Sequence, residues 1–395
     1  MTATPRPAHR TRRGEASRPV AAGPARSLGA VTPTPPPDPH RPLASIAGRV
    51  QGVLDEFLTD QRASLTEIAA ELAPLVDTAR GFLAGGKRLR PAFCYWGWRA
   101  AATHHQTPIL AGSALELFQA AALVHDDLID ASDTRRGSPS VHRRFEAAHR
   151  DAGWAGSASG FGLAAAILLG DLLLGWSDEV FEASSNDREV VARGRVIFER
   201  MRTEVGGGQY LDVLEQARGH QVDDPAEMAD RAMRVVRFKS ARYSVEHPVV
   251  KGATMGGADT DMITALHQYG AALGASFQLR DDILGVFGDP AVTGKPAGDD
   301  LREGKRTLLV AHALERATPI QRNALAALLG RPDLDEPGVS RARDVIEETG
   351  ALRRVEAMVD DGVAAAANAL DQADISPDGH LALTGLIHAA TARTT

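Results

Sequence analysis

The sequence predicts an all-α fold, built as a single large helical domain over residues 42–395. From Pro42 onward, apolar residues recur at spacings of three and four, which is the period of an amphipathic helix. The two-residue alternation typical of half-buried strands is nearly absent. No internal repeat of solenoid period and no linker interrupts this region, so we expect one domain.

The composition limits the possible functions. The chain has 395 residues, 44% of them hydrophobic, which is enough for a large core. Its net charge is −7 and no basic stripe dominates it, so we expect no nucleic-acid partner. Cys94 is the single cysteine, which favours a reducing, cytoplasmic location. The longest apolar run, Phe161–Trp176, is interrupted by Asp171 and is shorter than a bilayer span, so we expect no transmembrane segment.

Residues 1–41 differ from the rest of the chain. They are rich in Pro, Ala, Thr and Arg and show no hydrophobic periodicity, which predicts a disordered tail. An Arg-rich, acid-poor segment is also typical of an organelle transit peptide. Because no amphipathic helix is found in it, we favour the tail over an import signal.

Helices are predicted wherever the three-and-four spacing persists, in the following order. They cover Ile46–Leu58, Leu65–Leu75, Ala92–Ala102, Ile109–Asp130, Phe161–Phe181, Glu189–Gln216, Arg231–Val236, Ala241–Lys251, Ile263–Phe287, Leu301–Glu315, Gln321–Leu329, Val339–Glu348, Leu352–Ala373 and Leu381–Ala392. A loop is expected at Phe82–Leu89 because it contains Gly85 and Gly86. The segment Ala111–Leu123 is apolar at nearly every position, so its helix should be buried on all sides.

A D-D-x-x-D motif ends this buried helix. Asp126 and Asp130 are four residues apart and share a helix face, with Asp127 beside them. These carboxylates repel one another and lie at the negative end of the helix macrodipole. Hard cations would offset that cost, and a sparse carboxylate set that leaves room for water and phosphate oxygens suits Mg²⁺. The alternative is a solvated acidic helix end.

A second acidic motif, F-Q-L-R-D-D, ends the helix predicted at Ile263–Phe287 and contains Asp281 and Asp282. If the two helix ends face one another, they form a carboxylate-lined mouth above an apolar interior. That arrangement would hold metal ions and a diphosphate, while a hydrocarbon chain extends between the helices.

Basic segments accompany the acidic motifs. The loop Gly85–Pro91 combines glycines with cations suited to a phosphate or diphosphate, namely Lys87, Arg88 and Arg90. Lys239-Ser240 lies in an otherwise apolar helix, where the lysine either reaches a phosphate or extends to solvent.

The glycine-rich segment Gly294–Thr307 is predicted to be a basic flap. Lys295 and Lys305 could close over an anionic substrate. Asp299 or Asp300 is expected to be a helix N-cap rather than a metal ligand.

Taken in order, these motifs resemble those of the trans-isoprenyl diphosphate synthases, which make geranyl, farnesyl, geranylgeranyl and longer diphosphates. The motifs are G-G-K-R-L-R-P, D-D-L-I-D with R-R-G, K-S, F-Q-x-x-D-D and G-K-P-x-G-D-D-L-R-E-G-K, and the resemblance spans about residues 44–391. It implies a helical bundle of the isoprenoid synthase type around a central cavity, and a homodimer. Gly285 stands where many members have a third aspartate, which excludes a metal role at position 285.

The resemblance also implies residue roles. Mg²⁺ and the allylic diphosphate would be bound by Asp126, Asp127, Asp130, Asp281 and Asp282. The allylic diphosphate would contact Arg135, Lys239, Ser240, Gln278 and Lys295, with Lys305 as an additional contact. Isopentenyl diphosphate would be held by Lys87, Arg90, Gln119 and Arg136. Gln119 lies two turns before Asp126 on the same helix face, although it could also be a buried, hydrogen-bonded amide.

The implied chemistry begins when Mg²⁺ and the cations stabilise the departing diphosphate. The allylic C–O bond then ionises, the double bond of isopentenyl diphosphate attacks the carbocation, and a proton is lost to the released diphosphate. Water must be excluded to protect the cation.

Product length in this family depends on the bulk just before the first aspartate motif. Ala121 and Ala122 leave the channel unblocked there, and Phe118 lies about one turn deeper. We therefore expect geranylgeranyl diphosphate. A farnesyl or a longer product stays possible because side chains of Phe161–Leu174 could set the channel floor.

Two other classes of protein were weighed. A class I terpene cyclase is also all-α with D-D-x-x-D, but it would need an Asn/Asp-Ser/Thr-Glu second motif and would lack G-G-K-R-L-R-P. A non-catalytic subunit of a heteromeric prenyltransferase would usually have lost its acidic motifs, and both are intact here.

Overall fold

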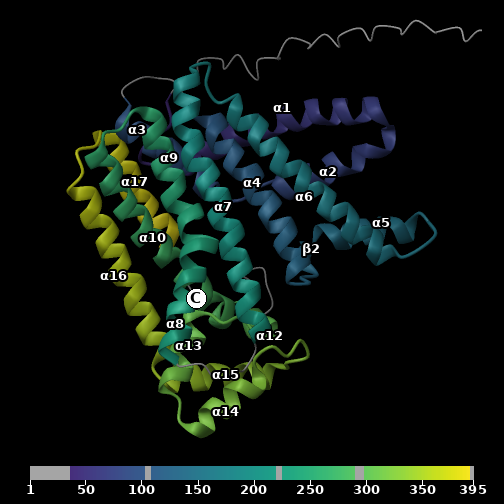
Figure 1. The fold of residues 1–395 in the computed structure, drawn as a ribbon, viewed down its shortest axis with the longest axis vertical. Helices are drawn as coiled ribbons and strands as arrows, with labels where there is room; N and C mark the ends of the chain where they lie inside the picture. The colour runs from purple at the N-terminus through teal and green to yellow at the C-terminus, as the bar shows by residue number, and fades with distance from the viewer. Residues whose placement is uncertain (1–35, 103–107, 219–224, 290–297, 392–395) are drawn as a thin grey trace, which may run out of the picture.

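The computed structural model describes residues 36–102, 108–218, 225–289 and 298–391 (Figure 1). Over these residues the chain is almost entirely helical, which confirms the all-α fold. The predicted disordered tail falls mostly on residues 1–35, and Lys295 on 290–297, so both lie outside the described residues.

The helices follow one another along the chain with short connections. In the first half they are α1 (Ala44–Ile68), η1 (Ala70–Leu72), α2 (Ala73–Leu83), α3 (Leu89–Ala101), α4 (Ile109–Ile129), α5 (Val141–Asp151), α6 (Ala158–Glu182) and α7 (Arg188–Arg218). The second half contains α8 (Pro225–Val235), η2 (Val236–Glu246), α9 (His247–Gly256), α10 (Thr260–Phe287), α12 (Asp299–Glu303), α13 (Leu308–Arg316), α14 (Pro319–Leu328), α15 (Glu336–Glu348), α16 (Ala351–Asp371) and α17 (Pro377–Thr391).

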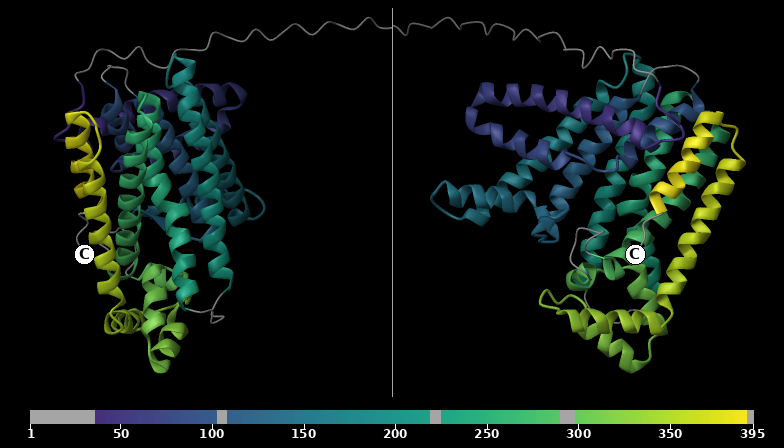
Figure 2. Two further views of the ribbon diagram at one scale, coloured as in Figure 1. Left: turned by 60° about the vertical axis from the view of Figure 1, so that its left-hand side comes forward. Right: turned by 180° about the vertical axis from the view of Figure 1, so that it is seen from behind.

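The long helices form a bundle that runs along the length of the molecule (Figures 1 and 2). α4 packs on α6, α3 on α9, and α10 on both η2 and α16. α1 and α2 cross one end of the bundle, and the shorter helices α13–α15 gather at the other end. One hydrophobic cluster fills the bundle, and a second joins α8 and the end of α10 to the α13–α16 group.

α4 is buried as its composition predicts. Small and large apolar side chains on several faces are almost fully excluded from solvent, among them Ala111, Leu115, Phe118 and Ala121. The helix ends at Ile129, with Asp130 as its C-cap and Ala131 at a positive φ of 51°. Its last turn therefore carries the first aspartate motif out of the core and toward the lower end of the bundle.

α10 lies close to η2 because glycines form the contact. A Cβ on Gly270 would lie 2.5 Å from Cα of Glu246, and one on Gly274 would lie 2.5 Å from the Ala241 carbonyl oxygen. Only glycine permits such an approach. The contact fixes α10, and with it the Asp281–Asp282 pair, beside the helix that carries Lys239.

That neighbouring helix is a π-helix over the 11 residues of η2. The sequence pattern predicts an ordinary helix at Ala241–Lys251 and does not distinguish the wider i→i+5 hydrogen bonding. Segments of this kind are frequent at functional sites, and η2 carries Lys239 and Ser240.

Several predicted boundaries are wrong. α1 runs unbroken through the expected gap before Leu65 and ends at Ile68, because Ala69 is extended with a φ of −162°. The short helix η1 follows, and α2 begins at Ala73. The helix expected at Leu301–Glu315 is divided by Gly304, with φ of 71°, into α12 and α13. The N-cap of α12 is Gly298 rather than an aspartate.

Two elements were missed by the sequence pattern. α5 is short and strongly charged, and only two of the residues on its buried face, Val141 and Phe145, are apolar. Thr134–Arg135 and Ser138–Pro139 form a two-residue antiparallel hairpin, β1–β2, that is too short for a period-two signal.

α6 is the one described helix that is long and apolar enough to meet the length and composition criterion for a bilayer span, and a third of its most apolar window is buried. It packs along α4 and α5, as a core helix does. Its other face carries apolar side chains that are exposed to solvent.

Candidate active site

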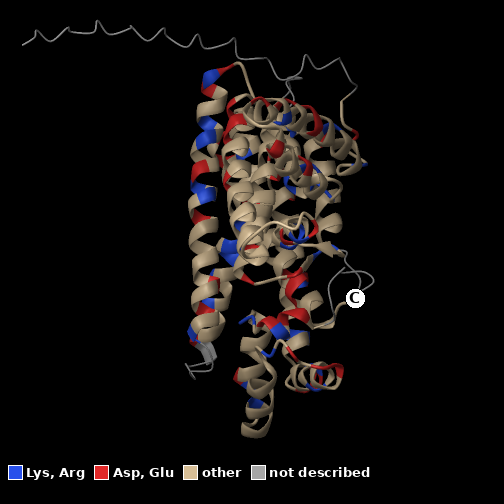
Figure 3. Cartoon of the chain, turned by 90° about the vertical axis from the view of Figure 1, so that its right-hand side faces the viewer, with Lys and Arg blue, Asp and Glu red and all other residues tan. Residues whose placement is uncertain are grey.

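A cavity of about 730 Å³ lies between the ends of α4 and α10, with α7, η2 and α12 completing its walls. Acidic and basic segments meet at this level, where the long bundle adjoins the smaller group of helices (Figure 3). The cavity brings together most of the predicted site residues: Lys87, Arg90, Gln119, Asp126, Arg135, Arg136, Lys239, Ser240, Gln278, Asp281, Asp282 and Lys305. The two acid-tipped helices therefore meet at one cavity, as the sequence predicts.

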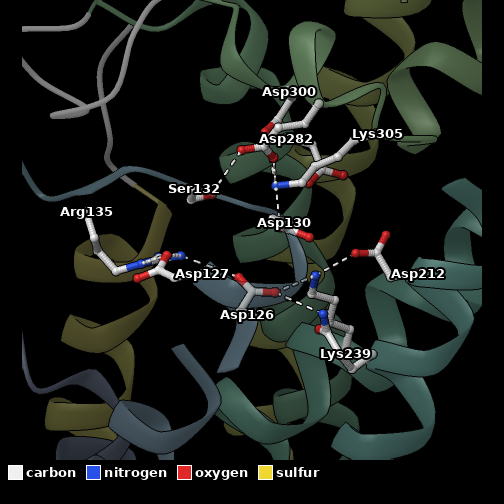
Figure 4. Close-up of polar contacts among 12 residues, drawn as sticks. Asp126, Asp127, Asp130, Ser132, Arg135, Asp212, Lys239, Asp282, Asp300 and Lys305 are labelled. Carbon is white, nitrogen blue, oxygen red and sulfur yellow. Dashed lines mark hydrogen bonds and ion pairs between the residues drawn. The ribbon is translucent and has the colours of Figure 1, made fainter. Parts of the chain in front are cut away.

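Asp126 is the carboxylate of the first motif that lines the cavity. Its Oδ1 accepts hydrogen bonds from Lys239 Nζ at 3.2 Å and Gln209 Nε2 at 3.0 Å, and its Oδ2 lies 3.4 Å from Arg135 (Figure 4). Burial opposes ionisation, but the charges of Lys239, Lys305 and Arg135 outweigh it and lower the pKa of Asp126. The carboxylate is thus held ionised among cations.

Asp127 is fully buried and does not line the cavity. Its Oδ1 accepts a hydrogen bond of 2.6 Å from Arg135 Nε. The hairpin β1–β2, which turns at Arg136 with φ of 52°, carries Arg135 back over the end of α4. In this structure Asp127 acts on Arg135, and it orients a guanidinium that faces the cavity.

Asp130 lies deeper, beside the flap. Its carboxylate is 3.7 Å from Lys305 Nζ, which also lies 2.6 Å from Glu303 and 3.5 Å from Asp300 (Figure 4). Burial, together with the nearby Asp126 charge, raises the pKa of Asp130 to about 6. Its Oδ1 is buried and has no hydrogen-bond partner among the described residues.

The second motif also contains a carboxyl group with a raised pKa. Burial, reinforced by the Asp300 carboxylate, raises the pKa of Asp282 to about 8. Gln278 Nε2 donates a hydrogen bond of 2.7 Å to Asp282 Oδ1, which orients it. Asp281, one residue earlier, lines the cavity directly.

These carboxylates fit a hard divalent cation. The pKa values of Asp130 and Asp282 are raised above the ordinary aspartate range, so both carboxyl groups tend to keep a proton. A bound cation would take the place of these protons and stabilise the ionised carboxylates. Within the described part of the chain, no three His, Cys, Asp or Glu side chains converge on one point. A cation bound here would need water and substrate oxygens as additional ligands, which is typical of Mg²⁺.

Cations crowd the opposite part of the wall. Arg90 Nη2 donates a hydrogen bond of 2.7 Å to Ser244, and its guanidinium stacks 4.2 Å from the Tyr243 ring centroid. Burial and the neighbouring Arg135, Arg88 and Arg90 charges lower the pKa of Arg136, against the pull of Glu116. Like charges held together in this way favour binding of a polyanion.

Part of the cavity surface is apolar. Its apolar lining residues include Ala122, Leu123, Val205, Val236 and Leu284. Gln119 faces the same cavity from α4, so its prediction as a lining residue is confirmed. One molecule with a charged head and a hydrocarbon tail would match both parts of the cavity.

Sequence reasoning missed two polar residues of α7. Gln209 binds Asp126, and Asp212 accepts a hydrogen bond of 2.6 Å from Lys239. The available signal was Gly206-Gly207-Gly208 just before them. A Cβ on Gly208 would overlap the Lys239 backbone, so this glycine allows α7 to touch η2 and sets Asp212 beside Lys239.

Comparisons with known proteins identify the family of this chain. The polyprenyl synthetase family model matches residues 74–346. A short chain isoprenyl diphosphate synthase of Methanothermobacter thermautotrophicus is 31% identical over 78% of this chain and 87% of its own length. A geranylfarnesyl diphosphate synthase of Aeropyrum pernix is 32% identical, over 69% of this chain and 79% of its own.

Solved structures agree as well. The crystal structure of geranylgeranyl pyrophosphate synthase from Corynebacterium glutamicum, complexed with isoprenyl diphosphate and magnesium, superposes with a TM-score of 0.84 and is 38% identical. The match covers 89% of this chain and 99% of that one. The chain therefore belongs to the polyprenyl synthetase family and is a trans-prenyltransferase, an isoprenyl diphosphate synthase.

Proposed function

We propose that this protein condenses isopentenyl diphosphate head to tail with an allylic diphosphate in the presence of Mg²⁺, and that its main product is geranylgeranyl diphosphate. The observation that carries the proposal is the shared cavity of Asp126 and Asp281–Asp282, which lies above an apolar lining and faces a basic wall.

The allylic diphosphate is assigned to the acidic side of the cavity. Asp126, Asp130, Asp281 and Asp282 would hold Mg²⁺, which neutralises the diphosphate and stabilises it as a leaving group. Asp127 acts on Arg135, which contacts the same diphosphate. Lys239, Ser240, Gln278, Lys295 and Lys305 are the remaining predicted contacts.

Isopentenyl diphosphate is assigned to the basic wall, at Lys87, Arg90, Gln119 and Arg136. The crowding of guanidinium groups there supports this choice, because a diphosphate would relieve their repulsion. The double bond of isopentenyl diphosphate would then lie between its own diphosphate and the allylic carbon.

The chain's own residues perform three tasks. The cations stabilise the charge that develops on the departing diphosphate. The apolar lining excludes water from the carbocation. The released diphosphate would accept the final proton, since the sequence motifs supply no conventional general base.

A product longer than farnesyl is favoured by the shape of α4. Ala122 lines the cavity and leaves room beside it, and Phe118 lies one turn deeper against Tyr243 and Phe198. Names of similar proteins include both geranylgeranyl and geranylfarnesyl synthases. The alternatives are therefore a longer product or the shorter farnesyl diphosphate.

A homodimer completes the proposal. One face of α6 exposes large apolar side chains to solvent, with exposed fractions of 48% for Leu163, 42% for Ile167 and 59% for Leu168. A second copy of the chain would cover this face.

A cytoplasmic location is proposed from the single, buried and reduced Cys94.

The proposal is tested by incubating the purified protein with isopentenyl diphosphate, each of dimethylallyl, geranyl and farnesyl diphosphate, and Mg²⁺. We expect geranylgeranyl diphosphate, and no product when the metal is chelated. Turnover that requires a second, different protein would instead favour a non-catalytic subunit of a heteromeric enzyme.

A further inference from the structure

A lysine is buried in the core beyond the end of the cavity. Lys251 of α9 is 1% exposed, and its Nζ donates a hydrogen bond of 2.9 Å to the Ala111 carbonyl oxygen of α4. The same ammonium lies 4.9 Å from the ring centroid of Phe181 and 4.8 Å from that of Phe198. Among the described residues, Cys94 is the one titratable group that acts on its charge, and no carboxylate does. A buried charge without a counter-ion is costly and calls for a reason.

The helix directions give the position of this lysine. Asp126 of α4, Asp212 of α7 and Lys239 of η2 contact one another at the acidic mouth. α4 and α7 run toward the mouth, whereas η2 and α9 run away from it. At 1.5 Å per residue, Phe118 lies about 12 Å below Asp126. The carbonyl of Ala111 lies about 22 Å below it on the same scale. Lys251 therefore lies well below Phe118, on the side away from the mouth.

A continuous set of aromatic rings joins the cavity to Lys251. Tyr243 lines the cavity, and its ring centroid is 6.3 Å from that of Phe118. Phe118 is 6.3 Å from Phe198, which in turn is 4.9 Å from Phe181. Met255 packs closely beside the set, since a Cβ on Gly194 would lie 2.6 Å from the Met255 side chain and 3.2 Å from Phe181.

We propose that Lys251, with the rings of Phe181 and Phe198, forms a second floor of the hydrocarbon channel below Phe118 and limits product length once Phe118 no longer blocks the channel. This inference rests on the proposed prenyl elongation. A chain that passed Phe118 would next push apart Phe198 and Lys251. It would replace two cation–π contacts and a hydrogen bond with hydrocarbon, and leave the ammonium buried without a partner.

The two floors act in series, so their variants should not be additive. Phe118→Ala opens the first floor, and we expect products longer by one or a few isoprene units. Lys251→Met alone keeps the length of the side chain but removes the charge, and it should leave the product unchanged because Phe118 still blocks the channel. The double variant Phe118→Ala/Lys251→Met should shift the ratio of still longer products by at least tenfold relative to Phe118→Ala.

The experiment compares chain-length distributions of these variants by chromatography, with farnesyl diphosphate and labelled isopentenyl diphosphate as substrates. Phe118→Ala/Phe57→Leu is the matched control, because Phe57 of α1 is equally buried but packs against Trp176 of α6 and does not line the cavity. Phe118→Ala/Phe198→Leu opens the second floor from α7 and should behave like the lysine double variant. Thermal melting shows that each variant is folded.

Identical product distributions for Phe118→Ala and both second-floor double variants would overturn the second floor and leave the proposed function standing. Absence of any prenyl product from the unaltered protein would overturn both. A longer product from Lys251→Met alone would also contradict the serial arrangement, because Phe118 would then not shield the lysine.

Discussion

The carboxylate of Asp300 occupies the space beside Gly285 that a side chain at position 285 would need. An ideal Cβ built on Gly285 would overlap Oδ2 of Asp300 and lie 2.5 Å from its Cγ. The absence of a third aspartate in the second motif is therefore matched by an aspartate from α12, which also pairs with Lys305 at 3.5 Å. The glycine lets the flap helix dock on the end of α10.

Gly285→Ala should weaken this docking. The added methyl would displace the Asp300 carboxylate and, through it, Lys305, so we expect kcat/KM to fall about tenfold, equal to about 1.4 kcal/mol. Steady-state kinetics measure the change. Gly52→Ala on α1 is the control, since no atom lies within 4 Å of its Cβ, and it should leave activity unchanged and stabilise the helix slightly. Equal activity of both variants would contradict the docking.

Asp126→Asn should remove a cation-binding charge from the mouth of the cavity. We expect kcat/KM to fall by roughly 10²–10³-fold, because stabilisation of the leaving group is lost. The fold should persist, since Lys239 keeps its hydrogen bond to Asp212. Activity at saturating Mg²⁺ and thermal melting measure the two effects, with the exposed Asp151→Asn as control. Near-normal turnover of Asp126→Asn would argue against the assigned role.

Asp282 predicts a pH dependence of stability in metal-free protein. The unfolded chain loses this proton near pKa 3.8, whereas the folded chain keeps it until about 8. The folded state thus binds more protons between these values, and its stability falls as pH rises through that window. Asp282→Asn cannot ionise, so its melting temperature should exceed that of the unaltered protein by a growing margin between about pH 6 and pH 8.

The difference between the two proteins is the quantity to measure in that experiment. Burial lowers the pKa of His247 and lowers that of Lys251 to about 8, and both act in the opposite direction in both proteins. Added Mg²⁺ should stabilise the unaltered protein more than Asp282→Asn. A margin that is constant with pH would show that Asp282 is not held protonated in the folded state.

Leu168→Glu should dissociate the proposed homodimer. A two-fold interface repeats the substitution, so two carboxylates would be buried on the apolar face of α6. We expect a loss of about 2–4 kcal/mol of association free energy, measured by sedimentation or light scattering. Ile320 on α14 is 81% exposed, and the control variant Ile320→Glu should leave the protein dimeric. A monomeric unaltered protein would remove the basis of this prediction.

Much of the site was readable from the sequence because helical period and motif spacing act locally. α4 and α10 are long and strongly apolar, so their existence and the position of Asp126 and Asp281 at their ends followed from the pattern. Gln119 was placed on the cavity wall by counting helical turns from Asp126.

The remainder depends on contacts between distant segments. Nothing local marks η2 as a π-helix, or pairs Lys239 with Asp212, which comes from α7. Asp127 shares the motif with Asp126 but binds Arg135, because the hairpin β1–β2 places Arg135 beside it. Asp300 was expected to be a helix cap, and only the packing of α12 on Gly285 brings its carboxylate to the second motif.

The most direct test of the account is a crystal structure with Mn²⁺ and an unreactive thiolo analogue of farnesyl diphosphate, in which anomalous scattering locates the metal ions. We predict metal peaks beside Asp126 and beside Asp281, with the diphosphate between them and the hydrocarbon tail running past Ala122 toward Phe118. Metal and diphosphate bound away from these aspartates, or a tail that leaves along another path, would contradict it.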